Sequence, residues 1–204
     1  MKSIVLQYLV VFGTVSALLG CASGNSKPEA AKVDSDPAAS ARIRLFGNNG
    51  TGVVFYRNQS CVPQNRQGGE RVSGGMGQSF KALVQVDQTE SIGMPPSQRS
   101  TRRRDGILAR EFSKEYHVKA GEPITVTMGF TGTPQMVTMN GVARSGRSES
   151  CSVPGGTFVP EAGKDYDVYL DIRRSEGICL ATVEAIDAAG GSVPAQVRPA
   201  TVCM

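Results

Sequence analysis

The sequence predicts an all-β fold over residues 41–204, an antiparallel β-sandwich or a small barrel. Three observations lead to this prediction. Short segments of alternating polar and apolar residues recur along this part of the chain, whereas helical spacing is hard to find. Glycine and proline are frequent, at 24 and 11 residues, and they supply turns between the alternating segments. About seven to nine short strands at this spacing are typical of a sandwich or barrel, and the sequence does not decide between the two.

The first predicted element is a hairpin. Residues 41–46 alternate between polar and apolar side chains, and a second apolar segment follows at residues 53–56. Between them lies a glycine-rich turn, residues 47–52, with an Asn-Gly pair that is a strong hairpin signal.

Two further segments have the period-two pattern of half-buried strands, residues 81–87 and residues 122–130. The apolar residues that share a face are Ala82, Val84 and Val86 in the first segment and Ile124, Val126 and Met128 in the second.

A turn-to-strand arrangement occurs twice, at residues 118–126 and 159–168. In each, an apolar residue leads to an Ala-Gly turn, a charged residue and an alternating strand, and glycine suits the positive φ that such turns need. We interpret the arrangement as a recurring hairpin of an antiparallel sheet. This pattern is similar to that of small β-sandwich lipoproteins of Gram-negative bacteria, a resemblance that implies no active residues.

The clearest strand pair spans residues 165–172 and 178–186, joined by a turn at residues 173–177. Its first strand directs Tyr166, Val168, Leu170 and Ile172 inward, and Asp165, Asp167 and Asp171 toward solvent. The three aspartates could hold Ca²⁺, but their straight spacing lacks the loop that wraps such an ion. The sequence therefore predicts no metal site.

The cysteines predict disulfides. With Cys21 set aside, Cys61, Cys151, Cys179 and Cys203 remain, and four thiols allow three pairings. We favour Cys151–Cys179, across the local strand system, which leaves Cys61 to pair with Cys203. The rival pairing joins Cys179 to Cys203. A zinc site is disfavoured because no C-x-x-C spacing occurs.

The N-terminus has the anatomy of a secretory signal, with Lys2 followed by an apolar run that reaches Leu19. The run ends in Ala17-Leu18-Leu19-Gly20-Cys21, which resembles the lipobox of bacterial lipoproteins. The resemblance implies that residues 1–20 are removed and that Cys21 carries lipid as a membrane anchor. Because Ala22 rather than Asp follows the cysteine, it also implies the outer membrane, facing the periplasm. Residues 21–40 would form a flexible tether of roughly 25 Å r.m.s. span.

An arginine-rich stretch is the candidate partner site. Arg99, Arg102, Arg103 and Arg104 lie in a segment without a strand pattern. One interpretation is a loop that docks on an anionic protein, glycan or lipid, because arginine presents a rigid fork of donors. The other is a solvated loop that contacts nothing in particular. Nucleic acid is not expected, since no aromatic residues interleave with the basic ones.

The sequence favours a non-enzymatic protein with a structural or binding role. The chain has one histidine, His117, and no catalytic or cofactor-binding motif that we recognise. The alternative is a periplasmic hydrolase of unrecognised type with His117 as general base. No cofactor is expected.

Lipidation at Cys21 is directly testable. In a host that processes lipoproteins, the Cys21→Ala variant should lose acyl labelling and stay unprocessed at this site, because it lacks the acceptor thiol. Metabolic labelling with palmitate measures this, and equal incorporation in wild type and variant would contradict the prediction.

Overall fold

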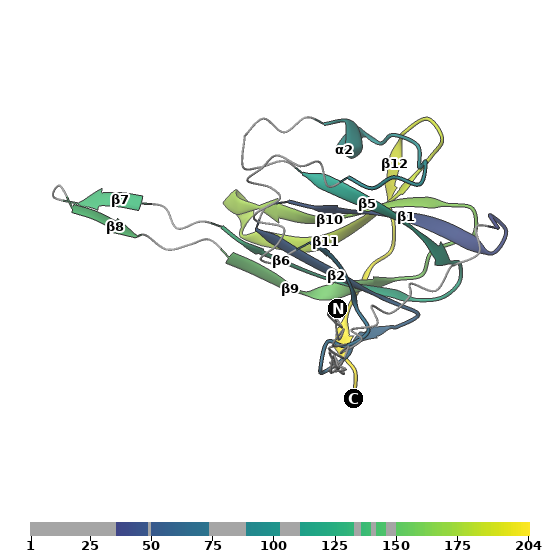
Figure 1. The fold of residues 1–204 in the computed structure, drawn as a ribbon, viewed down its shortest axis with the longest axis horizontal. Coiled ribbons are helices and arrows are strands. Elements are labelled where there is room, and N and C mark those ends of the chain that lie inside the picture. The colour runs from purple at the N-terminus through teal and green to yellow at the C-terminus, as the bar shows by residue number, and fades with distance from the viewer. Residues whose placement is uncertain are drawn as a thin grey trace, which may run out of the picture. The chain divides into compact units, whose positions relative to one another are not determined.

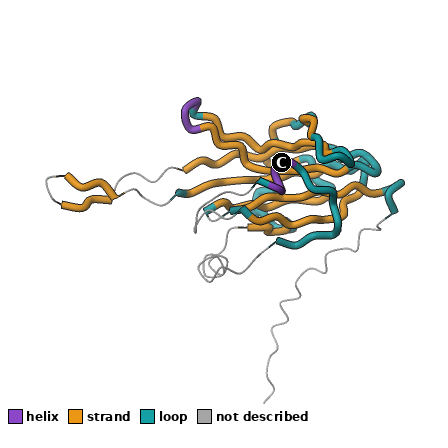
Figure 2. The backbone as a smooth tube through the Cα atoms, turned by 90° about the horizontal axis from the view of Figure 1, so that it is seen from above, coloured by secondary structure: helices purple, strands orange, loops and turns teal. Residues whose placement is uncertain are grey.

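The computed structural model describes residues 36–48, 50–73, 89–102, 111–132, 136–139, 142–145 and 150–204. Two sheets, each of five strands, pack face to face without closing into a barrel, which confirms the β-sandwich (Figure 1). Strands make up most of the described backbone, and helix occurs only in short turns (Figure 2). Cys21 and the predicted strand at residues 81–87 lie outside the described residues.

The first sheet, sheet A, has the strand order β12-β11-β10-β1-β5. Strand β1 pairs in parallel with β10 and in antiparallel with β5, and β10 pairs in antiparallel with β11. The β10–β11 pair confirms the clearest strand pair predicted from the sequence. The bounds are β12 Ser192–Pro194, β11 Ile178–Ile186, β10 Asp165–Arg173, β1 Ser40–Gly47 and β5 Phe112–Lys119.

The second sheet, sheet B, has the strand order β13-β9-β6-β2-β4 and is antiparallel. Its bounds are β13 Arg198–Pro199, β9 Ser150–Phe158, β6 Ile124–Thr131, β2 Thr51–Arg57 and β4 Glu70–Ser73.

The remaining elements are β3 Cys61–Val62, β14 Thr201–Val202, β7 Met136–Met139, β8 Val142–Ser145, the short helix α2 Gln98–Thr101 and a 3-10 turn at Arg174–Glu176. Strand β3 pairs with β14, and β7 with β8.

The core lies between the two sheets. Alternate residues of each strand point into it, as period two requires. The predicted face of β6 is confirmed, because Ile124, Val126 and Met128 are all buried. In sheet A the facing residues include Ile43, Leu45, Tyr166 and Val168. Within the described ranges, no helix has the length and apolar character needed to cross a bilayer.

The predicted hairpin of residues 41–56 is wrong. Strand β1 belongs to sheet A and β2 to sheet B, so the glycine-rich turn carries the chain between sheets. The turn itself forms, with the Thr51 N–H donating to the Asn48 carbonyl at 3.1 Å. The Asn-Gly signal reports only this local turn, whereas β1 pairs along its whole length with β5, and β2 with β6.

The two Ala-Gly turns also connect sheets rather than hairpin strands. The first links β5 in sheet A to β6 in sheet B, and the second links β9 in sheet B to β10 in sheet A. The predicted positive φ is confirmed, at 77° for Gly121 and 71° for Gly163. These glycines donate at 2.8 Å to the carbonyls of Pro160 and Ser40 respectively, so both turns and the start of β1 gather at one end of the sandwich. We call it the entry end.

Both favoured disulfides are confirmed. Cys151 and Cys179 join β9 in sheet B to β11 in sheet A, at the end of the sandwich opposite the entry end. Cys61 and Cys203 join β3 to the residue that follows β14. The rival Cys179–Cys203 pairing is therefore wrong.

The two disulfides close loops of very different length, with sequence separations of 142 for Cys61–Cys203 and 28 for Cys151–Cys179. Restriction of the unfolded chain alone predicts a loss of about 5 kcal/mol when the long loop is opened and about 3.6 kcal/mol for the short one. Urea unfolding of the Cys61→Ser/Cys203→Ser and Cys151→Ser/Cys179→Ser variants measures the order. A larger loss from opening the short loop would contradict loop closure as the main contribution.

Candidate functional site

The outward face of β10 is covered rather than wet, which corrects the sequence prediction for two of its three aspartates. Asp165 and Asp167 are buried, with 8% and 1% of their surface exposed. The parallel register places Arg42 beside Asp165 and Arg44 beside Asp167. Arg42 donates to both carboxylate oxygens of Asp165 at 2.6 and 2.7 Å. These ion pairs could not be predicted from local sequence patterns, because their members lie 123 residues apart.

Arg44 forms the centre of a buried cluster with Glu115 and Asp167, which we call the Arg44 cluster. Its guanidinium lies 2.7 Å from a Glu115 oxygen and 3.2 Å from an Asp167 oxygen, and these side chains are at most 4% exposed. Burial of an ion pair is costly unless every remaining donor and acceptor is satisfied. The guanidinium meets that condition by donating also to the carbonyls of Met94 and Pro95, at 3.3 and 2.9 Å.

Residues 89–102 supply these carbonyls and lie over the outer face of sheet A; we call them the strap. The strap also bonds to the acids of the cluster. Ser97 Oγ donates to Asp167, and one Glu115 oxygen accepts three bonds from the strap. Those three donors are Ser91 Oγ at 2.7 Å, the Ile92 N–H at 2.7 Å and the Met94 N–H at 3.1 Å.

The two acids of the cluster have pKa values shifted in opposite directions. Burial raises the pKa of Glu115, but the hydrogen bonds from Ser91, Met94, Arg44 and Ile92 together outweigh burial and hold it below its usual 4.5. For Asp167, burial dominates over the bonds from Ser97 and Arg44 and raises the pKa above its usual 3.8.

The structure separates the predicted arginine set. The guanidinium of Arg99 is not free to bind an anion as predicted, because it lies 2.6 Å from Glu111. It also lies 3.7 Å from the Tyr169 ring centre, and the Arg99 side chain is only 16% exposed. Arg102 is exposed and follows α2. Arg103 and Arg104 lie outside the described residues.

His117 lies in β5, opposite Arg42. Its Nδ1 is buried and has no hydrogen-bond partner in the described part of the chain. A histidine that acts as a general base needs a partner that fixes its tautomer. The described residues therefore give no support to a catalytic role for His117.

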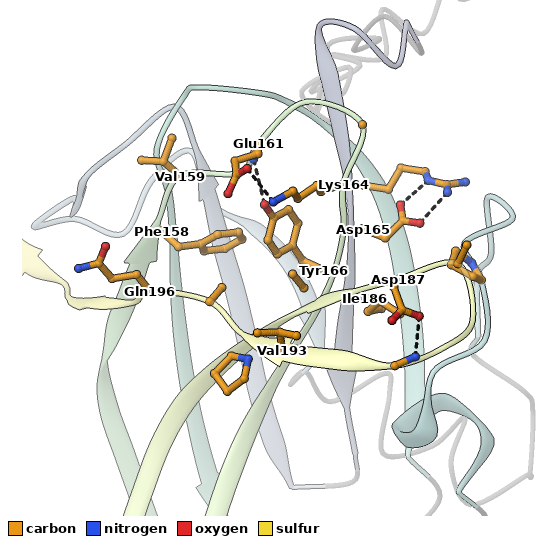
Figure 3. A pocket seen from close by; sticks show the side chains of 18 of the residues that line it. Phe158, Val159, Glu161, Lys164, Asp165, Tyr166, Ile186, Asp187, Val193 and Gln196 are labelled. Carbon is orange, nitrogen blue, oxygen red and sulfur yellow. Dashed lines mark hydrogen bonds and ion pairs between the residues drawn. The ribbon is translucent and has the colours of Figure 1, made fainter.

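A groove of about 1350 Å³ lies at the entry end (Figure 3). The β9–β10 connection forms one wall, and the end of β11 with β12 and the residues after it forms the other. Phe158 and Tyr166 lie between the walls, with ring centres 5.5 Å apart. The Tyr166 hydroxyl accepts the Glu161 N–H at 3.0 Å, so the ring is fixed against one wall.

The groove exposes an aliphatic residue on each wall. Val159 follows β9 and is 44% exposed, and Val193 in β12 is 66% exposed. Figure 3 shows the two valines on opposite sides of the Phe158 and Tyr166 rings. An isolated exposed valine needs no explanation, but two that face one hollow offer a contact surface for an aliphatic group.

The charged groups around the groove are compensated, with one exception. Arg42 pairs with Asp165, and Lys164 lies 2.7 Å from Glu161. Asp187 accepts the backbone N–H groups of Ala189 and Gly191 in its own turn, at 2.9 and 2.8 Å. Arg198 is exposed and, among the described residues, has no ion-pair partner.

Sequence reasoning missed the groove. Its lining comes from five stretches of the chain that the sheet topology brings together, so no local pattern marks it. The one available signal was residues 192–199, Ser-Val-Pro-Ala-Gln-Val-Arg-Pro, where aliphatic and polar residues alternate around two prolines.

Comparison with known proteins finds no matching family model, no matching curated protein and no matching solved structure.

The opposite pKa shifts predict opposite pH dependences. Glu115, with a lowered folded pKa, contributes stability that is present above pH 4.5 and is lost as pH falls through the folded pKa. The Glu115→Gln variant should therefore have a free energy of unfolding about 2 kcal/mol below that of wild type at pH 7. This difference from wild type should shrink toward pH 3.

Asp167 has a raised folded pKa, so wild type gains stability from its protonation as pH falls toward 3.8. The difference in the free energy of unfolding between wild type and Asp167→Asn should therefore grow as pH falls.

Urea midpoints from pH 3 to pH 7 measure both profiles. Asp171→Asn is the matched control, because Asp171 lies on the same strand but is less buried and pairs with Arg173. Parallel profiles for Glu115→Gln and Asp167→Asn would contradict the assignment.

Proposed function

We propose that this protein is a lipid-anchored protein of the bacterial outer membrane, facing the periplasm, whose β-sandwich binds a partner and catalyses no reaction. The anchor is Cys21, and the binding site is the groove at the entry end. The proposed binding function rests on the groove, because the groove is open and offers aliphatic contacts on both walls. Among the described residues it also holds one cation without an ion-pair partner, Arg198.

The two disulfides support the proposed location. Disulfides form and persist in oxidising compartments such as the bacterial periplasm. The lipobox resemblance of residues 17–21 implies export to that compartment. The disulfides and the N-terminal motif are independent features that favour the same compartment.

The Arg44 cluster supports binding over catalysis. A catalytic acid or base must reach its substrate, whereas the side chains of Glu115 and Asp167 are 4% and 1% exposed beneath the strap. Their hydrogen bonds go to Arg44 and to the strap, which assigns them to holding the strap on sheet A. We propose no second function, because no described contact orients His117 as a base.

A photo-crosslinking amino acid at Val193 tests the proposed function in cells that carry the lipidated protein. We expect a discrete crosslinked product, because Val193 is 66% exposed on the groove wall. The matched control carries the crosslinker at Leu180, which is 48% exposed in β11 outside the groove. Mass spectrometry identifies the product. Equal crosslinking at both positions, or none at Val193, would contradict the groove as the binding site.

A further inference from the structure

Strand β12 leaves one edge of sheet A open beside the groove. It is the last strand in the sheet order and pairs only with β11. At the other edge of the sheet, Glu90 already pairs with β5, donating to Ser113 and accepting from Glu115 at 2.9 Å each. Among the described strands of sheet A, β12 thus presents the unpaired edge, and its residues Val193 and Pro194 line the groove.

The hydrogen-bond pattern identifies which backbone groups of β12 are free. The Asp187 N–H donates to Gly191 at 3.0 Å, and the Ala195 N–H donates to Val183 at 2.9 Å. Because hydrogen-bonded and non-bonded pairs alternate in an antiparallel ladder, Val193 bonds to β11, whereas Ser192 and Pro194 direct their backbone groups outward. The open edge therefore offers the N–H of Ser192 and the carbonyls of Ser192 and Pro194.

The side chains around this edge favour a negatively charged ligand. Three basic residues line the groove, and two of them have acidic partners. Arg198 has none in the described structure and lies beside the exposed amide residue Gln196. A ligand with a carboxylate near Arg198 gains a charge-assisted hydrogen bond, whereas a cationic ligand meets an uncompensated like charge.

The remaining lining disfavours sugars and acyl chains. A sugar ring stacks on an exposed aromatic face, but Phe158 and Tyr166 are only 3% and 2% exposed. An acyl chain needs an apolar enclosure, and here charged residues surround the hollow. An extended peptide uses every free feature at once, since its backbone pairs with an open edge and its alternating side chains occupy pockets.

We infer that the groove binds an extended acidic peptide segment, which adds as a strand to β12, places an aliphatic side chain between Val159 and Val193 and directs a carboxylate to Arg198. This inference rests on the proposed function, which makes the groove the binding site.

The test uses the full lipidated protein in detergent micelles and fluorescein-labelled, end-blocked heptapeptides of alternating Thr and Val. The central residue is Glu, Gln or Lys, and fluorescence anisotropy measures binding. We expect the Glu peptide to bind roughly tenfold more tightly than the Gln peptide, the order expected for one charge-assisted hydrogen bond, and the Lys peptide to bind most weakly.

Matched variants locate the interaction. Arg198→Ser should abolish the preference for Glu over Gln, whereas Arg102→Ser removes an exposed arginine outside the groove and should keep it. Val193→Ser, which removes the aliphatic contact without adding charge, should weaken all three peptides, and Val202→Ser, at a 62% exposed position outside the groove, should not. Retention of the preference in Arg198→Ser, or its loss in Arg102→Ser, would overturn the assignment of charge selection to the groove.

N-methylation tests strand addition. Two versions of the Glu peptide carry N-methyl groups on alternate amides, and only one set of amides can face β12. One version should therefore lose binding while the other keeps it. Equal tolerance of both would overturn the strand geometry.

The crosslinker at Val193 separates the inference from the proposed function. If no peptide binds but Val193 captures a lipid or a glycan, the peptide inference fails and the proposed function stands. If no peptide binds and Val193 captures nothing, both fail.

Discussion

The buried ion pair between Arg44 and Asp167 is the constraint on which the rest of the structure depends. A guanidinium keeps its charge at any accessible pH, so its burial requires all of its partners to be present together. Those partners come from β10, from β5 and from the strap. The cluster therefore links three distant parts of the chain, and a strap without secondary structure over most of its length stays bound because the charge beneath it must be satisfied.

The parallel pairing of β1 with β10 generates the buried cluster. It places Arg42 and Arg44 beside Asp165 and Asp167, and it leaves the outer face of β1 charged and in need of cover. The strap supplies that cover on the β5 side of sheet A. At the opposite edge of the sheet, β12 has no strand partner other than β11 among the described residues. One sheet thus has a charged face that holds the strap and an unpaired edge that we propose for binding.

The sequence predicted the local features well and the long-range ones poorly. The fold class, the buried face of β6, the β10–β11 hairpin and the positive φ of Gly121 and Gly163 all follow from period two and from turn chemistry. The sheet assignment of β1 and β2 did not follow, because an Asn-Gly turn serves a hairpin and a crossing between sheets equally. The outward aspartates were misread for a related reason: alternation gives the direction of a side chain, not what lies over it.

Rigidity explains why the groove suits an extended ligand. The turns at the entry end are bonded to each other and to the start of β1, through Gly121 and Gly163. At the opposite end, Cys151 and Cys179 fix the spacing of the two sheets. A site that is already ordered loses little conformational freedom on binding. Most of the ordering cost then falls on the peptide, so segments that already favour an extended backbone, rich in β-branched residues, have the advantage, and Arg198 selects among them by charge.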